Sequence, residues 1–301
     1  MQNNSQTAIL KTILYSDIFH FPLTQEELWR FLIADKAVTH AAFVTALKHL
    51  PQNIVFHDGY YCLAGHEKLV QQRKRYSTEA AKKDKIAQAA ASMLSYIPTI
   101  RFIGISGSAA LGNVTARDDI DLFIVTRRKA LFLTRLWILA ILELKHVRRR
   151  RNEINAANKV CVNLLIDESN LQWPPHKRDV YVAHEIAQVK PLFERKGMYR
   201  AFLQSNKWIT TFLPNAFQGE QDIVGTSWHR QYYTLAIISR ILQLLPVNIF
   251  VTWWQKRYMQ KHRTTEIVTN TYLAFHPYDY RAKTLRLLQQ KYADFGLLTK
   301  I

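Results

Sequence analysis

Apolar residues recur every three or four positions through the first fifty residues, a spacing that predicts amphipathic helices. Helices are expected at about 8–16, from Thr24 onward, and at about 39–50. Thr24 and Glu27 have the S/T-x-x-E spacing of a capping box, in which each side chain binds the backbone N–H of the other residue. The beginning of the second helix is therefore the best defined point of this region.

Two short apolar runs, 53–57 and 60–63, follow these helices and flank Asp58 and Gly59. A two-residue Asp-Gly turn between apolar runs is the strongest short signal for a β-hairpin. Three helices followed by a hairpin resemble a winged helix-turn-helix module, which places a first module at residues 1–65. The helix that would read DNA carries a single lysine, so a role in packing or protein contact is favoured over base reading.

The next part of the chain alternates helical and strand-like patterns. Residues 66–97 are rich in Ala and Lys, contain no Gly or Pro, and predict one linking helix. A central unit at residues 98–168 is expected to hold three buried strands and a long helix. The strands are predicted at 100–105, 120–126 and 159–166, and the helix at 130–146.

Residues 169–301 have the pattern of helices separated by prolines. Helices are predicted near 179–188, 198–213, 228–254, 255–274 and 280–295. Gly296 is well placed to end the last of them as a C-cap. The chain is therefore expected to be an α+β protein with a helical C-terminal region.

The net charge of the chain indicates which classes of partner it can attract. Forty-one Lys and Arg stand against 23 Asp and Glu, which gives a formal net charge of +18. Such an excess attracts nucleic acid, nucleotide phosphates or an anionic membrane. Basic residues cluster at 73–75 and at 127–151, where nine Lys or Arg accompany one acid. Solvated helix faces are the alternative interpretation of both clusters.

Two cysteines make neither a disulfide framework nor a zinc pattern, and they fit a reducing cytoplasm. The first residues lack the basic-then-apolar order of a signal peptide. Residues 235–254 are largely apolar but include Arg240, Gln243 and Pro246. Because such residues are costly in lipid, a buried or interfacial helix is expected there and a membrane span is not.

Candidate chemistry begins at Gly107 and Ser108, which follow a predicted strand. A glycine at a strand-to-helix turn lets a phosphate approach the backbone, where free N–H groups face the anion. Gly107 and Gly112 have the glycine spacing of a P-loop, but Asn113 and Val114 stand where that loop requires Lys and Ser or Thr. The turn is therefore a phosphate-binding candidate of another kind.

Asp119 and Asp121 open the predicted strand that follows this turn. Side chains at positions i and i+2 of a strand point to the same face, with Cα atoms about 6–7 Å apart. Two carboxylates placed in this way can share a pair of Mg²⁺ ions about 3.5–4 Å apart. A turn-capping role explains Asp121 poorly, since a carboxylate inside an apolar strand is costly to bury without a cation.

Ile105-Ser-Gly-Ser-Ala-Ala-Leu-Gly followed by Asp119-Ile-Asp-Leu-Phe-Ile-Val resembles the signature of the DNA-polymerase-beta-like nucleotidyltransferase superfamily. The resemblance covers about residues 98–168. It implies a small mixed-sheet core and transfer of a nucleoside monophosphate from a nucleoside triphosphate (NTP) to a hydroxyl. It also implies that Gly107 and Ser108 bind the nucleotide's phosphates and that Asp119 and Asp121 ligate Mg²⁺.

A third acid is the point at which the chain departs from this family. Active members carry an acid on a neighbouring strand, where it deprotonates the attacking hydroxyl or completes the metal site. The matching position holds Asn163. Asp167 has the same strand parity and is included among the predicted catalytic residues; Glu185, on a predicted helix, is a further candidate. Without such an acid, the domain would bind nucleotide without efficient turnover.

Three functional hypotheses follow. The first is a cytoplasmic Mg²⁺-dependent nucleotidyltransferase whose acceptor is RNA, a protein or a small molecule, with the charge weakly favouring RNA. The second is a DNA-binding regulator whose nucleotidyltransferase-like domain senses a nucleotide. The third is a peripheral membrane protein that uses residues 232–257.

Overall fold

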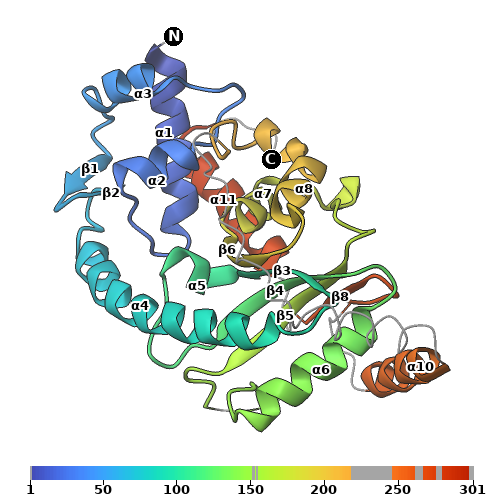
Figure 1. The fold of residues 1–301 in the computed structure, drawn as a ribbon. Coiled ribbons are helices and arrows are strands. Elements are labelled where there is room, and N and C mark those ends of the chain that lie inside the picture. Colours follow the sequence, from blue (N-terminus) through green and yellow to red (C-terminus); the bar gives the residue numbers. More distant parts are fainter. Residues whose placement is uncertain are drawn as a thin grey trace.

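The structure is a computed structural model that describes residues 2–150, 153, 155–217, 246–261, 267–275 and 280–297. It is a mixed α+β protein in which helices cover both faces of a six-stranded mixed sheet (Figure 1). The α+β class expected from the sequence is confirmed.

The N-terminal elements are three helices and a hairpin, in the predicted order. They are α1 (Gln2–Asp17), α2 (Gln25–Arg30), α3 (His40–Leu47), β1 (Ile54–His57) and β2 (Tyr60–Leu63). The capping box before α2 is confirmed, because the side chains of Thr24 and Glu27 each accept a hydrogen bond from the other's backbone N–H. Asp58 and Gly59 form the hairpin turn with φ angles of 51° and 92°, the positive values that a tight β-turn of this kind requires.

These N-terminal elements share one hydrophobic core with the last helix, α11 (Tyr280–Asp294). Leu288 and Tyr292 of α11 are buried in that core against α1. Lys291 of α11 also forms an ion pair with Asp17 at 2.6 Å. Residues far apart in the sequence therefore stabilise each other at this end of the molecule.

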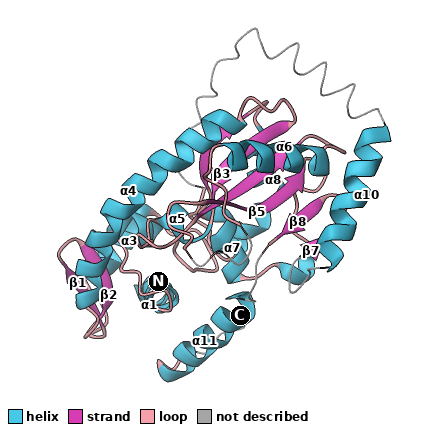
Figure 2. Ribbon diagram, turned by 90° about the horizontal axis from the view of Figure 1, so that it is seen from below, coloured by secondary structure: helices cyan, strands magenta, loops and turns pink. Residues whose placement is uncertain are grey.

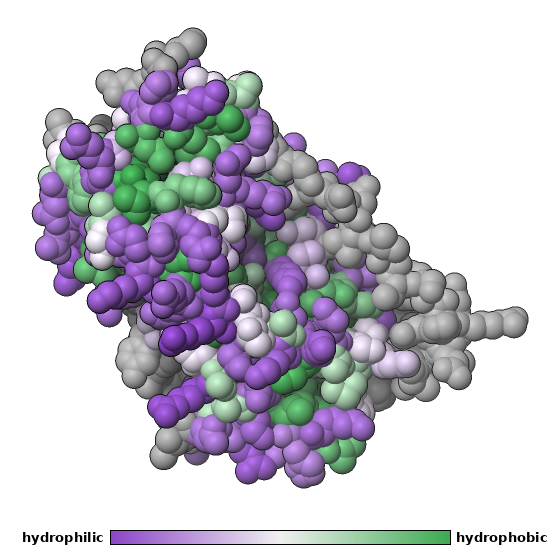
Figure 3. Space-filling view, turned by 90° about the vertical axis from the view of Figure 1, so that its left-hand side faces the viewer, coloured by the Kyte–Doolittle hydropathy of each residue, from purple (hydrophilic) through white to green (hydrophobic). Residues whose placement is uncertain are grey.

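Helix α4 (Lys68–Leu94) runs from the N-terminal elements to the sheet and confirms the predicted linking helix. Hydrophilic residues cover much of the face that carries β1, β2 and α4 (Figure 3). Arg73 and Lys74, from the first basic cluster, form ion pairs with Glu27 and Asp58. Part of that cluster thus serves to attach α4 to the N-terminal elements.

The sheet contains strands from the central unit and from the C-terminal region. Its strands are β3 (Ile100–Ile105), β4 (Ile120–Thr126), β5 (Val160–Asp167), β6 (Lys190–Glu194), β7 (Ile267–Val268) and β8 (Tyr272–Ala274), in the spatial order β6-β3-β4-β5-β8-β7. Strands β4 and β5 are parallel, and the other neighbours are antiparallel. The three predicted strands are β3, β4 and β5, each placed within one residue of its predicted bounds.

Alternate residues of β4 face opposite layers of helices. Ile120, Leu122 and Ile124 lie in the core beneath α4, α6 (Leu131–Leu144) and α10 (Pro246–Lys261). Phe123 and Val125 lie in a second core beneath α7 (Val180–Ala187) and α8 (Met198–Ser205). Figure 2 shows α6 and α10 beside the sheet at the end away from β1 and β2. Asp121 shares the second face, so α7 covers the side of the sheet on which the predicted acids lie.

The C-terminal region differs in part from its prediction. Helices α7 and α11 are confirmed, and Gly296 follows α11 with a φ of 66°, as expected of a C-cap. The helix predicted at 198–213 is confirmed only as far as Ser205, where α8 ends, and a short 3-10 helix follows at Lys207–Thr211. The first residues of the helix predicted at 255–274 lie in α10, but the prediction is wrong at 267–274, where β7 and β8 form; β6 was not predicted either. Most of the predicted helix at 228–254 lies outside the described residues. Among the described helices, none is long and apolar enough to cross a membrane.

Candidate metal and nucleotide site

The bend after β3 lies directly against the second predicted acid. Gly107 has a φ of 64° at the start of the short helix α5 (Gly107–Leu111). A Cβ atom on Gly107 would lie 3.3 Å from Oδ2 of Asp121. The backbone N–H of Ser106 donates to the carbonyl of Asp121 at 2.9 Å, which fixes the bend to β4. The structure therefore brings the predicted phosphate-binding turn and this carboxylate together.

Asp119 and Asp121 lie at the beginning of β4 with a third metal-ligating side chain, Cys161 of β5. One ligand atom from each of the three residues lies within 4.8 Å of the other two. Cys161 reaches this position because β4 and β5 are parallel and pair Asp121 with Cys161. Carboxylates are ligands suited to Mg²⁺ or Mn²⁺, whereas a thiol suits softer ions. The two acids fit the predicted ion; sequence reasoning did not foresee the thiol.

A guanidinium group already neutralises part of this cluster. Nη1 of Arg149 lies 2.6 Å from Oδ2 of Asp119, and the Arg149 side chain is 37% exposed. The backbone N–H of Arg149 donates to the carbonyl of Val160 at 3.0 Å, so the segment before β5 holds this arginine beside the acids. The neighbouring residues Arg148 and Arg150 instead form ion pairs with Glu143. Within the second basic cluster, Arg149 is thus a direct neighbour of the predicted site.

Burial shapes the protonation of the cluster. Burial, followed by the nearby charge of Asp119, raises the pKa of Asp121 to about 7, and Arg149 opposes this rise. Burial and the two carboxylates raise the pKa of the Cys161 thiol, so that the thiol stays neutral near pH 7. A cation held between the acids would favour their charged forms. The site is therefore chemically better suited to a bound cation than to an isolated pair of charged acids.

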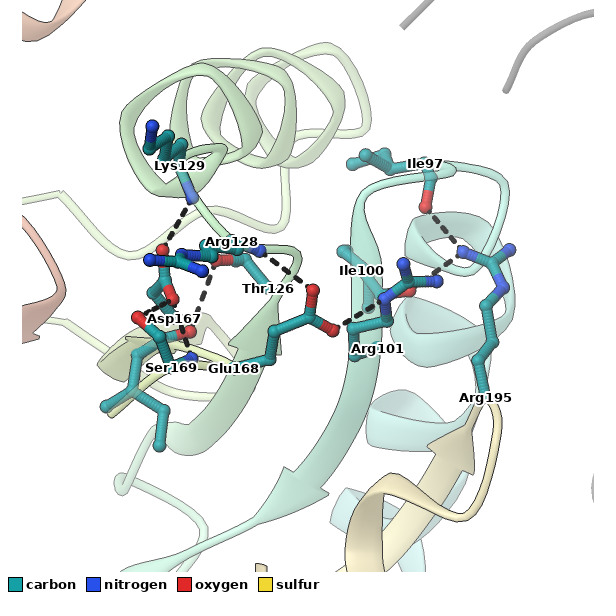
Figure 4. A network of polar contacts seen from close by, with 11 residues as sticks. Ile97, Ile100, Arg101, Thr126, Arg128, Lys129, Asp167, Glu168, Ser169 and Arg195 are labelled. Carbon is teal, nitrogen blue, oxygen red and sulfur yellow. Dashed lines mark hydrogen bonds and ion pairs between the residues drawn. The ribbon is translucent and has the colours of Figure 1, made fainter. Parts of the chain in front are cut away.

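Asp167 does not join this cluster, contrary to the expectation that it supplies the third acid. Asp167 pairs with Thr126 at the other end of β4. Thr126 lies five residues beyond Asp121, which is about 17 Å along the strand. Its buried carboxylate accepts hydrogen bonds from the backbone N–H groups of Lys129 (2.6 Å) and Ser169 (2.7 Å) and from the Ser169 hydroxyl (2.6 Å), as Figure 4 shows. Asp167 stabilises two turns.

A β-bulge explains why Asp167 does not lie on the face of the sheet that its position in the strand predicted. The pairing of β4 with β5 shifts between Leu122 and Phe123, which leaves Asn163 as an extra residue. Leu165 consequently lies in the core beneath α4 and α6, on the face opposite to Phe123. Two residues further along, Asp167 points away from the acid pair for the same reason.

Glu185 of α7 is the remaining predicted candidate, and it shares a cavity with the site. This cavity of about 360 Å³ is lined by Gly107, Ser108, Asp121, Asn163 and Glu185, among others. A second cavity of about 450 Å³ shares Asn163 and Glu185 with the first. Burial raises the pKa of Glu185 to about 7, and its charge is among the causes that raise the pKa of Asp121. Glu185 therefore stands where the two cavities meet.

The N-terminal elements form one wall of the first cavity. Tyr15, Phe19 and Phe21 line it, and the ring of Tyr15 stacks on that of His184 with centroids 3.9 Å apart. Burial lowers the pKa of His184 to about 4, and its Nδ1 lies 2.8 Å from the carbonyl oxygen of Val180. His184 is thus a neutral packing residue. The site depends on elements from the whole length of the chain.

No family model, curated protein or solved structure matches this chain. The function is therefore inferred from the chemistry of the site.

Proposed function

We propose that the chain is a divalent-metal-dependent nucleotidyltransferase that transfers a nucleoside monophosphate from an NTP to a hydroxyl group. The observation that carries this proposal is the close approach of the Gly107 bend to the Asp121 carboxylate. A Cβ atom on Gly107 would lie only 3.3 Å from Oδ2 of Asp121. A phosphate-binding turn beside a pair of acids is the arrangement that an NTP bound through metal ions requires. The central unit would then be a nucleotidyltransferase core.

Each residue of the site has a role in this proposal. Asp119 and Asp121 would ligate Mg²⁺, and the bound ion would supply positive charge to neutralise the triphosphate and the charge that develops at the α-phosphorus. Gly107 lacks a Cβ, so the phosphates can approach the backbone of Gly107 and Ser108 closely. Arg149 would exchange Asp119 for a phosphate oxygen when the nucleotide binds, since guanidinium groups pair well with phosphates.

Glu185 is the best placed residue to accept a proton in this reaction. The acceptor hydroxyl would lose its proton to the Glu185 carboxylate as its oxygen forms a bond to the α-phosphorus. The bond from the α-phosphorus to the bridging oxygen would break at the same time, and pyrophosphate would leave. A general base with a pKa near 7 suits a reaction at neutral pH, and burial gives Glu185 that pKa.

The shape of the site favours a small acceptor over a long RNA. The two cavities lie beneath α7 and are walled by aromatic side chains, which include Tyr15, Phe19, Trp173 and Tyr272. Small ligands are commonly held in largely apolar cavities of about 300–1,000 Å³ with a few polar groups. This support from the cavities outweighs the weak preference for RNA that the net charge gave.

The test is Mg²⁺-dependent labelling of acceptors from a metabolite extract and from cellular RNA with each of the four radiolabelled NTPs. The wild type should release pyrophosphate, and the double variant Asp119→Ala/Asp121→Ala should not. Asp35→Ala, an exposed acid outside the site, is the matched control and should behave as the wild type. Equal labelling by the wild type and the double variant would remove the proposed site.

A DNA-binding regulator is the second candidate, favoured by the three helices and hairpin at the N-terminus, which we propose form a winged-helix unit. Thr45 on α3, the helix that would enter the major groove, and Lys48, which caps its C-terminus, are exposed. Duplex binding that weakens steeply with salt and is reduced by Lys48→Glu would support this function. Absence of duplex binding at low salt would dismiss it.

A further inference from the structure

Helix α10 exposes an unusual row of large apolar side chains. Five of them are 50–75% exposed: Ile249, Phe250, Trp253, Trp254 and Tyr258. Their spacing of three or four residues places them along one side of the helix. We call these five residues the α10 stripe. Isolated exposed apolar residues are ordinary, but a contiguous group of this size marks an interaction surface.

The opposite side of α10 fixes the rotation of the helix. Val251, Gln255 and Met259 are buried there. The Gln255 side chain donates to the carbonyl of Phe132 in α6 and accepts from Nη1 of Arg135, both at 2.8 Å. Because these polar contacts are specific and are buried or partly buried, α10 cannot turn its stripe inward without breaking them. The stripe is therefore held outward by the fold.

Within the described part of the chain, α10 lies where a broad surface can reach this side. Figures 1 and 2 both show α10 at the periphery of the molecule, beside α6 and away from the N-terminal elements. The neighbouring helix α6 also exposes an aromatic residue, Trp137, whose side chain is 47% exposed. A peripheral helix can lie flat against a planar partner, which a helix inside a groove cannot do.

The composition of α10 indicates the chemistry of the partner. Trp, Tyr and Phe are the residues that favour the boundary between lipid headgroups and acyl chains. The helix has no acidic residue, and Arg257 and Lys261 are exposed among or beyond the stripe. The guanidinium of Arg257 lies 5.7 Å from the ring centroid of Trp253, so charge and aromatic surface are presented together. The whole chain carries +18, which complements an anionic surface.

We propose that the α10 stripe is a membrane-anchoring surface that lies in the headgroup region of anionic bilayers. The aromatic and aliphatic side chains insert into the boundary layer while Arg257 and Lys261 contact lipid phosphates. The helix binds the surface and does not span the bilayer. The α10 stripe does not include residues of the proposed nucleotidyltransferase site, so either proposal can be correct without the other.

The experiment is sedimentation of the full chain with vesicles of phosphatidylserine and phosphatidylcholine, compared with phosphatidylcholine alone. We expect the wild type to sediment with the anionic vesicles and to show a blue shift of tryptophan emission. Phe250→Glu/Trp253→Glu should weaken vesicle binding at least about tenfold, because two apolar side chains are lost from the lipid phase. Phe56→Glu, at an aromatic residue 60% exposed on β1, is the matched control and should bind as the wild type.

Arg257→Glu/Lys261→Glu should reduce binding to anionic vesicles and make the remaining binding insensitive to salt. An unchanged far-ultraviolet circular dichroism spectrum of each variant establishes that it is folded. A wild type that stays in the supernatant with anionic vesicles would overturn the proposal, as would equal sedimentation of the Phe250→Glu/Trp253→Glu variant. A wild-type dimer in light scattering that this variant converts to monomer, without vesicle binding by either, would assign the stripe to a second copy of the chain.

Discussion

Replacing Glu185 by Gln should make the protein more stable at alkaline pH while impairing the proposed reaction. The Glu185 carboxyl is buried, and its pKa rises from the ordinary value of 4.5 to about 7. The native state therefore holds this proton more tightly than the unfolded chain does. As pH rises from about 4.5 to about 7, this group progressively destabilises the native state, and above pH 7 the penalty is constant.

The size of the penalty follows from the shift. At about 1.4 kcal/mol per pH unit, the shift corresponds to about 3.5 kcal/mol, which partial access to solvent reduces to about 2 kcal/mol. A glutamine keeps the shape of the side chain and carries no charge, so Glu185→Gln should be about 2 kcal/mol more stable than the wild type at pH 8. At pH 4 the two proteins should unfold alike. Groups that titrate or carry charge and line the two cavities together with Glu185 include Tyr15, Asp121, Lys177, Tyr181, His184, Tyr280 and Arg281.

Urea denaturation monitored by circular dichroism between pH 4 and pH 8 measures this difference. Glu26→Gln, which makes the same chemical change at an exposed site, is the control and should leave the pH dependence as it is in the wild type. In the labelling assay, Glu185→Gln should lower kcat by about 10²–10⁴-fold, the range of general-base catalysis. Parallel stability curves for the wild type and Glu185→Gln from pH 4 to pH 8 would refute the assigned environment.

Three further variants test the site and its surroundings. Gly107→Ala should cost about 1–2 kcal/mol in urea denaturation, since its φ is 64°, and should raise the KM for NTP; an unchanged KM would contradict close phosphate contact. Arg149→Ala should tighten Mn²⁺ binding about two- to fivefold in calorimetry, because the exposed ion pair with Asp119 is lost; weaker binding would exclude competition. Asp167→Asn should lower the free energy of unfolding by about 2–4 kcal/mol and leave the affinity for Mn²⁺ unchanged. Loss of Mn²⁺ binding in this variant would instead indicate that Asp167 is a metal ligand.

The parts of the fold that were predicted are those encoded by local sequence. The Asp58-Gly59 turn and the Thr24–Glu27 capping box need only neighbouring residues, and both formed where expected. The apolar runs of β3 and β4 are buried on both faces, so each run was visible without knowledge of its partners. The contact between Gly107 and Asp121 follows from the antiparallel pairing of the neighbouring strands β3 and β4, which sets Ile105 opposite Leu122.

The structural features that were not predicted from the sequence arise from contacts between segments that are distant in the chain. Strands β7 and β8 are two and three residues long and exist because β8 pairs with β5, which no local pattern reveals. Cys161 and Arg149 reach the acids through parallel pairing and through the segment before β5. The extra residue at Asn163 reversed the facing of the strand, so counting by twos predicted Asp167 on the face of the acid pair, where the structure does not place it.

The wall that the N-terminal elements contribute to the cavity has a consequence for how this chain can vary. Tyr15 stacks on His184, and α1 packs against α11, so the N-terminal elements are a structural part of the first cavity. A natural relative could not exchange these elements for unrelated ones without remodelling that cavity. We therefore expect positions 15 and 184 to change together across descendants of a common ancestor, and chimeras that join foreign N-terminal elements to this core to lose both solubility and the shape of the cavity.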